Sequence, residues 1–150
     1  LTNMDGSSDW VTSGLSLVDP TEENPLDDLL IGGSIQGSPL SLSGTVTTFA
    51  GSAGSSGTTD GTGTSARFNV PHGITTDGSN LFILDHNNHT IRKITISSGV
   101  VTTLAGTAGS SGSTDGTGSE ARFNKPTSIT TDGTNLYVTD PLNHTIRKIQ

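Results

Sequence analysis

The chain has 150 residues, of which 29% are hydrophobic, 4% are aromatic and 20 are glycine, so its core must be thin and built from small side chains. Because it contains no cysteine, it has neither disulfides nor thiolate metal sites, and no run of about 18 apolar residues is present that could span a membrane. All seven basic residues lie beyond residue 44 and are balanced there by seven acids, so the net charge of −7 resides in residues 1–43 and leaves no basic surface for nucleic acid or anionic lipid.

The charge pattern divides the chain into two regions. We expect residues 1–43 to form an acidic, Gly- and Ser-rich N-terminal segment and residues 44–150 to form a neutral domain. The chain starts at Leu1 and not at an initiator Met, so we also expect an upstream targeting segment to have been removed.

Residues 44–150 are dominated by an internal repeat with a period of 55 residues. Val46–Thr95 aligns with Val101–Gln150 without a gap, and 35 of the 50 paired residues are identical. Most substitutions are mild, such as Phe49 to Leu104 and Phe82 to Tyr137. The two copies are therefore expected to share one backbone fold.

Each repeat contains short β-branched runs separated by turn residues. In the first copy the expected strands are Gly73–Thr76, Leu81–Leu84, Thr90–Ile96 and Val100–Ala105, with a hairpin turn at Asp77–Asn80. Four short strands in a period of about 40 to 55 residues are typical of a β-propeller blade. The fold class expected is all-β, with two four-stranded antiparallel blades that form an incomplete ring in one chain.

Phe68 and Phe123 lie just before the first strand of each repeat and are the largest apolar side chains in their stretches. We expect them to pack between adjacent blades. The recurring Arg67 and Arg122, one residue earlier, are expected to form ion pairs with a nearby aspartate rather than to bind substrate.

The two copies resemble NHL repeats of the bacterial extracellular type. The resemblance covers residues 44–150 and rests on the motifs Ala66–Phe68, Pro71–Ile74, Asp77–Gly78, Asn80–Ile83, and Asp85 followed by Asn88–Arg92, which recur from Ala121 to Arg147 with Ser128 in the place of Gly73. The resemblance implies an extracellular or cell-surface propeller.

Two blades cannot close a ring, because a propeller needs at least about four. The repeat region begins with an unpaired strand, Thr45, Val46, Thr47, Thr48, Phe49 and Ala50, and the second copy stops after its third strand. Three explanations stay open: the chain is a fragment of a longer propeller, several chains close one ring with each spare strand completing a neighbour's blade, or chains add head to tail into a filament.

Polar residues recur in one turn of each repeat, namely Asp85, Asn88, His89, Asp140, Asn143 and His144. Asp and Asn at these spacings usually bond to the turn backbone, so we interpret these residues as structural. Asp60–Gly63 and Asp115–Gly118 resemble calcium loops, but one carboxylate per loop is too few for a confident site. We therefore predict no cofactor, no metal site and no catalytic residue, with calcium as the weaker alternative.

The function expected is a non-catalytic extracellular module for binding or self-assembly. Its partners would be further copies of the chain, in a homo-oligomer or filament, or a protein ligand, and neither nucleic acid nor a membrane. The alternative comes from the resemblance: some related propellers are lactonases or lyases with a metal in the central channel, and this chain would then be a fragment of such an enzyme.

Overall fold

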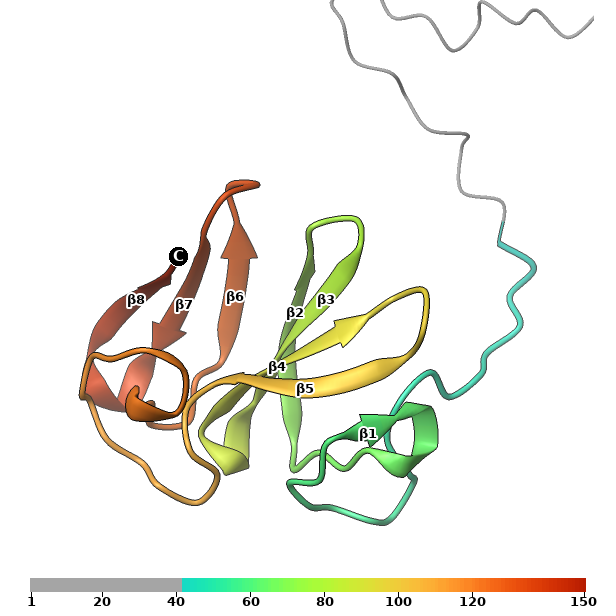
Figure 1. Ribbon diagram of the computed structural model, residues 1–150, viewed down its shortest axis with the longest axis horizontal. Coiled ribbons are helices and arrows are strands. Elements are labelled where there is room, and N and C mark those ends of the chain that lie inside the picture. The colour runs from blue at the N-terminus through green and yellow to red at the C-terminus, as the bar shows by residue number, and fades with distance from the viewer. Residues whose placement is uncertain (1–41) are drawn as a thin grey trace, which may run out of the picture. The chain divides into compact units, whose positions relative to one another are not determined.

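The computed structural model describes residues 42–150, so the predicted segment 1–43 lies almost wholly outside the described residues. Residues 46–150 form one unit built from two antiparallel sheets, and no α-helix occurs between residues 42 and 150. The predicted all-β class is confirmed. Figure 1 shows the two sheets standing side by side.

The first sheet has the strand order β1-β5-β4-β3-β2. The bounds are β1 Gly61–Thr62, β2 Pro71–Thr76, β3 Asn80–Asp85, β4 Thr90–Thr95 and β5 Val100–Ala105. The four predicted strands are confirmed to within two residues at either end. The two-residue strand β1 is an addition that Gly61 and Thr62 did not indicate, because so short a strand carries no alternating pattern.

The second sheet has the order β6-β7-β8, with β6 Ser128–Thr131, β7 Leu136–Asp140 and β8 Thr145–Ile149. It thus has three strands where a complete blade has four. Single 3₁₀ turns join the elements: η1 Gly63–Ser65, η2 His86–Asn88, η3 Gly118–Glu120 and η4 Pro141–Asn143.

The predicted hairpin turn at Asp77–Asn80 is present. The carboxylate of Asp77 accepts the backbone N–H groups of Ser79 and Asn80 at 2.8 and 2.6 Å, and Gly78 takes a φ of 91°. The hydrogen bonds from Asn80 and Ser79 lower the pKa of the Asp77 carboxyl. This turn aligns β2 and β3 so that Leu81 pairs with Thr76.

The main core lies between the two sheets. It joins Phe82, Leu84 and Ile91 of the first sheet to the inner face of the second sheet, which contributes Ile129, Leu136 and Val138. Phe123 is 2% exposed within this core. The innermost strands β2 and β6 approach closely at Gly73, where an added Cβ would lie 3.0 Å from the carbonyl oxygen of Thr127.

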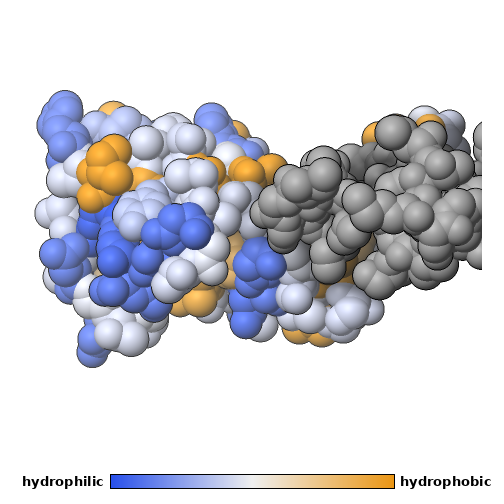
Figure 2. Space-filling view, turned by 90° about the horizontal axis from the view of Figure 1, so that it is seen from above, coloured by the Kyte–Doolittle hydropathy of each residue, from blue (hydrophilic) through white to orange (hydrophobic). Residues whose placement is uncertain are grey.

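A second, smaller cluster covers the opposite face of the first sheet. It contains Ala66, Ile83, Ile94 and Val101, with Phe68 packed against it. Ile74 on the same side is 58% exposed. In the view of Figure 2, hydrophobic residues form separate patches between hydrophilic ones. No helix among the described residues has the length and apolarity needed to cross a membrane.

Candidate strand-accepting site

The two repeats share one strand position, which is filled in the first sheet and open in the second. In the first sheet, β5 lies between β4 and β1, with Thr103 opposite Arg92 and Val101 opposite both Ile94 and Gly61. In the second sheet no described strand pairs with the outer edge of β8. Gly116 and Thr117, the counterparts of β1, lie free of a strand partner. The filled position therefore serves as a template for the open one.

Arg92 anchors the filled position. Its guanidinium donates to the Asp85 carboxylate at 2.9 Å and to the Asp60 carboxylate at 2.7 Å. It also donates to the carbonyl oxygens of Arg67 and Thr59 at 2.9 and 3.1 Å. The side chain is 1% exposed. Two carboxylates and two carbonyls thus compensate the loss of hydration at its two terminal nitrogens, while Nε is buried without a partner among the described residues.

The aromatic ring of Phe68 completes the environment of Arg92. The guanidinium carbon lies 5.0 Å from the ring centroid, which is within the range of a cation–π contact. Phe123 and Arg147 repeat the contact at 5.2 Å. Phe68 and Phe123 therefore each contact an arginine guanidinium and also pack against apolar side chains of the core.

Asp60 links this network to the strand itself. Its carboxylate accepts the backbone N–H of Thr103 at 3.2 Å and the Thr103 hydroxyl at 3.1 Å, while it also holds Arg92. The Asp60 side chain remains 49% exposed. A threonine at this register therefore fastens β5 to the loop that precedes β1.

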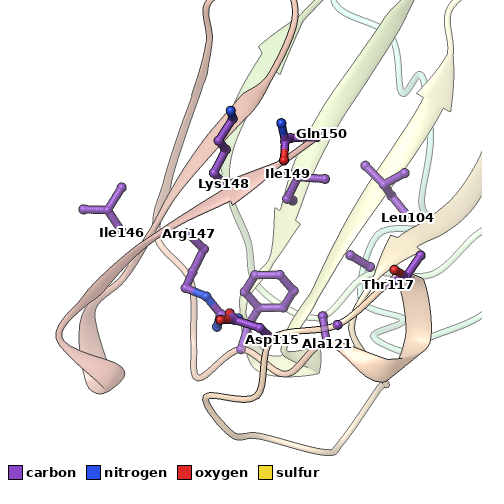
Figure 3. Close-up of a pocket in the computed structure, with 13 residues that line it drawn as sticks. Leu104, Asp115, Thr117, Ala121, Ile146, Arg147, Lys148, Ile149 and Gln150 are labelled. Atoms are coloured by element: carbon purple, nitrogen blue, oxygen red, sulfur yellow. The ribbon is translucent and has the colours of Figure 1, made fainter.

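The open position forms a cavity of about 620 Å³, which we call the open slot. It is bounded by Leu104 and Ala105 of β5, by residues 115–118 and by residues 146–150. Figure 3 shows Arg147 extending from β8 toward Asp115 at the floor of the slot. The apolar lining includes Ile149 and Phe123.

The ionic groups of the open slot match those of the filled position, but they are more exposed. Arg147 donates to Asp115 at 2.6 Å and to Asp140 at 3.4 Å. The side chain of Arg147 is 10% exposed and that of Asp115 is 95% exposed, against 1% and 49% for Arg92 and Asp60. Among the described residues, Asp115 has no partner other than Arg147. The slot thus presents a carboxylate with free acceptor positions where Asp60 binds a strand.

The predicted blade-completing strand, Thr45–Ala50, belongs to neither sheet. Val46 is 93% exposed and Phe49 is 46% exposed. Thr48, Phe49 and Ala50 line a second cavity of about 370 Å³ together with residues of the smaller cluster. The strand role of this segment stays a prediction.

The end of that segment nevertheless repeats the end of β5. An added Cβ on Gly51 would lie 3.3 Å from the ring of Phe68, and an added Cβ on Gly106 would lie 3.3 Å from the ring of Phe123. Gly51 N–H donates to the Gly63 carbonyl as Gly106 N–H donates to the Gly118 carbonyl. Gly51 therefore contacts the first repeat in the same way that Gly106, the residue after β5, contacts the second repeat.

The predicted inter-blade residues differ in their surroundings. Phe123 lies in the core shared by both sheets, whereas Phe68 is half-buried on the outer face of the first sheet. The ion pairs expected for Arg67 and Arg122 are wrong: Arg67 donates to the carbonyls of Thr64 and Ala66, and Arg122 bonds to backbone in the same way. Within residues 42–150 the paired arginines are Arg92 and Arg147.

The polar turn residues lie together at one end of each sheet. Asn88 donates to the carboxylate of Asp85 and to the carbonyl of Gly57, both at 2.7 Å, and Asn143 repeats this with Asp140 and Gly112. His89 and His144 end the 3₁₀ turns with φ of 59° and 57°. Sequence reasoning missed Arg92 and Arg147, although an arginine in a β-branched strand that follows a recurring aspartate suggests a buried ion pair.

Known proteins share this arrangement in part. No protein-family model matches the chain. Human NHL repeat-containing protein 2 is 36% identical over 95 residues, which are 61% of this chain and 13% of that protein. A crystal structure of a Bacteroides thetaiotaomicron protein of unknown function superposes with a TM-score of 0.63 at 35% identity, covering 67% of this chain and 26% of its own.

The two repeats are of the NHL type. An auxiliary nutrient binding protein from Bacteroides ovatus also superposes, with a TM-score of 0.60 at 36% identity, over 68% of this chain and 28% of its own. The chain spans 13% of the human relative and about a quarter of the solved structures. Each sheet is thus one NHL-type propeller blade; within residues 42–150 the outer strand is present in the first blade and no strand occupies that position in the second.

Proposed function

We propose that the chain is a non-catalytic, extracellular or cell-surface NHL-repeat module that self-assembles head to tail, with Val46–Ala50 of one copy filling the open slot of the preceding copy. The single observation that supports this most strongly is the match between Asp115 and Thr48. Thr48 lies 55 residues before Thr103, as Asp60 lies 55 residues before Asp115. The donor strand thus carries the threonine that the open slot lacks.

The first blade supplies the register of the proposed contact. Because Arg92 pairs with Thr103 and Ile94 pairs with Val101, Thr48 of the donor would lie opposite Arg147 and Val46 opposite Ile149. The N–H and hydroxyl of Thr48 would then donate to the Asp115 carboxylate. Added strands of this kind gain affinity from main-chain hydrogen bonds and specificity from alternate side chains.

Burial of apolar surface favours the same contact. Val46 corresponds to Val101, which is 1% exposed in β5, yet Val46 itself is 93% exposed. Phe49 corresponds to Leu104, which lines the open slot from the neighbouring sheet. Donation of the strand would remove Val46 from water and cover the apolar edge of β8.

The assembly would be heterologous, because the donor strand and the open slot are different surfaces of one chain. Such contacts close into a ring if the rotation between copies permits and otherwise extend into a filament. Ser128 limits the fit: it stands where Gly73 allows the close approach of β2 and β6, so its Cβ would press on the next copy's backbone near His72. The innermost strands of two copies must therefore lie slightly farther apart.

A similar solved structure supports a binding role for the module. One of the similar structures is an auxiliary nutrient binding protein, and a completed propeller offers the concave surfaces that such a module needs. The extracellular location rests on the resemblance of the repeats to bacterial extracellular NHL proteins.

Sedimentation velocity of the 150-residue chain over a range of concentrations tests the assembly. We expect a concentration-dependent series of species at neutral pH, and electron microscopy to distinguish rings from filaments. Thr48→Pro should abolish assembly, because proline removes the N–H that the slot requires. Ser43→Pro, outside the donor strand, is the matched control and should assemble normally.

Asp115→Asn tests the receiving side. Because Asp115 is 95% exposed, the change should leave folding intact, while the loss of charge-assisted bonds should weaken assembly about tenfold or more. A chain that stays monomeric at every concentration, or a Thr48→Pro variant that assembles as well as the parent, would show the proposal to be wrong. Those outcomes would instead favour a slot filled by further repeats of the same polypeptide.

A further inference from the structure

One hydrogen bond between the two blades depends on the protonation state of a histidine. The backbone N–H of Lys125, in the loop before β6, donates to Nδ1 of His89 at 3.1 Å. Nδ1 accepts a hydrogen bond only when it carries no proton, so this bond requires neutral His89 with its proton on Nε2. A protonated imidazole would place a second donor against the amide and break the bond.

The backbone holds both partners of this bond in an uncommon conformation. His89 and Lys125 have φ of 59° and 55°, in the left-handed region. The corresponding residues of the other repeat, His144 and Val70, have φ of 57° and 55°. Each repeat therefore presents one histidine and one amide in the geometry that the bond needs.

His144 and Val70 are the unused halves of this arrangement. His144 is exposed, and its ring has no hydrogen-bond partner within residues 42–150. Val70 is 49% exposed, and its N–H donates to no acceptor in the same range. His144 lies on the second blade, whose slot is open, and Val70 lies on the first blade, which follows the donor strand.

A second hydrogen bond between the two repeats involves no titratable group. Gly109 N–H donates to the carbonyl of Asn88 at 3.2 Å, which ties the connection between the repeats to the first blade. Gly54 and Asn143 are the corresponding residues. They would form the equivalent bond between copies at any pH.

We infer that His144 Nδ1 of one copy accepts the Val70 N–H of the next, and that proton uptake by His144 breaks this bond and separates the copies. The inference rests on the head-to-tail assembly proposed above and adds its regulation. Mild acid would dissociate the assembly, and a return to neutral pH would restore it.

The charged neighbours of the two histidines differ. Burial lowers the pKa of His89, the neighbouring Lys125 and His86 lower it further, and Asp140 raises it. At the contact between copies, Val70 takes the place of Lys125, Pro141 takes the place of His86, and Asp85 takes the place of Asp140. His72 takes the place of Thr127 there and stacks on His86 of its own blade. The contact between copies thus lacks the lysine, keeps a carboxylate and gains this histidine pair.

The test compares the dissociation constant of assembly at pH 7.5 and pH 5.5, measured by sedimentation on the full chain. For the parent we expect assembly to weaken about tenfold or more at pH 5.5, since a lost hydrogen bond is replaced by an unpaired donor. His144→Asn should remove this pH dependence: asparagine tolerates the left-handed conformation and offers a side-chain oxygen as acceptor, but it does not titrate.

His144→Gly provides a second variant, which tolerates the left-handed conformation but offers no side-chain acceptor. It should assemble more weakly than the parent at pH 7.5 and show no further loss at pH 5.5. Assembly of the parent that is equal at both pH values, or a pH dependence that persists in His144→Asn, would overturn the inference and leave strand donation intact. A parent that fails to assemble at pH 7.5 would overturn both.

Discussion

The buried pair of Asp85 and Arg92 should dominate the stability of the first blade. Asp85 is 0% exposed and Arg92 is 1% exposed, and their closest atoms are 2.9 Å apart. Asp85 also accepts the N–H of Asn69 and the amide of Asn88, both at 2.7 Å. Three donors therefore converge on one carboxylate.

Asp85→Asn preserves the shape of the side chain but replaces one acceptor oxygen with a donor. At least one of the three donors then faces an N–H group, and Arg92 loses a buried counter-charge. Removing one partner of a buried ion pair costs about 3–5 kcal/mol, against a total stability of about 5–15 kcal/mol for a domain. For a unit of this size the fall in Tm should exceed about 10 °C.

Thermal denaturation followed by circular dichroism measures the effect. Asp140→Asn in the second blade is the matched control, because Arg147 is 10% exposed and lies 3.4 Å from Asp140. The fall in Tm should be clearly smaller for Asp140→Asn than for Asp85→Asn. If Asp85→Asn lowers Tm by less than Asp140→Asn does, the reasoning from burial and distance is refuted.

Three further predictions concern the contact between the blades. Gly73→Ala should destabilise the chain by about 1–3 kcal/mol, because the new Cβ would lie 3.0 Å from the Thr127 carbonyl; chemical denaturation measures the loss, and an unchanged midpoint would contradict it. Phe123→Ala should cost about 3–5 kcal/mol and Phe68→Ala less, since only Phe123 is enclosed by both sheets; equal losses in the same assay would argue against the packing described. Because the pKa of folded His89 is lowered, chiefly by burial, the unfolded chain takes up the proton first as the pH falls below the ordinary value of about 6.5. Stability should therefore decline below that pH, and a His89→Asn variant should decline less in parallel thermal scans.

Much of the fold could be predicted because its signals are local. The strands β4 and β5 and the turn at Asp77 could be predicted because their signals come from neighbouring residues in the sequence. The 55-residue repeat indicated that both sheets share one fold. The spare strand Thr45–Ala50 was visible by comparison with Val100–Ala105. The two-residue strand β1 could not be found in this way, because its pairing with β5 spans about 40 residues and leaves no periodic pattern.

The candidate site was less accessible to sequence reasoning. The recurrence of Arg67 and Arg122 beside the phenylalanines suggested ion pairs there, yet Arg92 and Arg147 form them, because only the folded sheet reveals which arginines point into a water-free interior. The stretch Asp60–Gly63 resembles a calcium loop in sequence. In the fold, however, the Asp60 carboxylate accepts hydrogen bonds from Arg92 and Thr103.

The sequence by itself determined that the chain contains two copies of one short-stranded unit and that Val46–Ala50 repeats β5, because periodicity and turn chemistry are properties of neighbouring residues. The tertiary structure alone decided that Asp115 is left exposed while Asp60 is engaged, and that His89 accepts a hydrogen bond that His144 lacks within the described residues. These differences arise between segments far apart in the chain, where the presence or absence of one strand changes the exposure of otherwise identical residues.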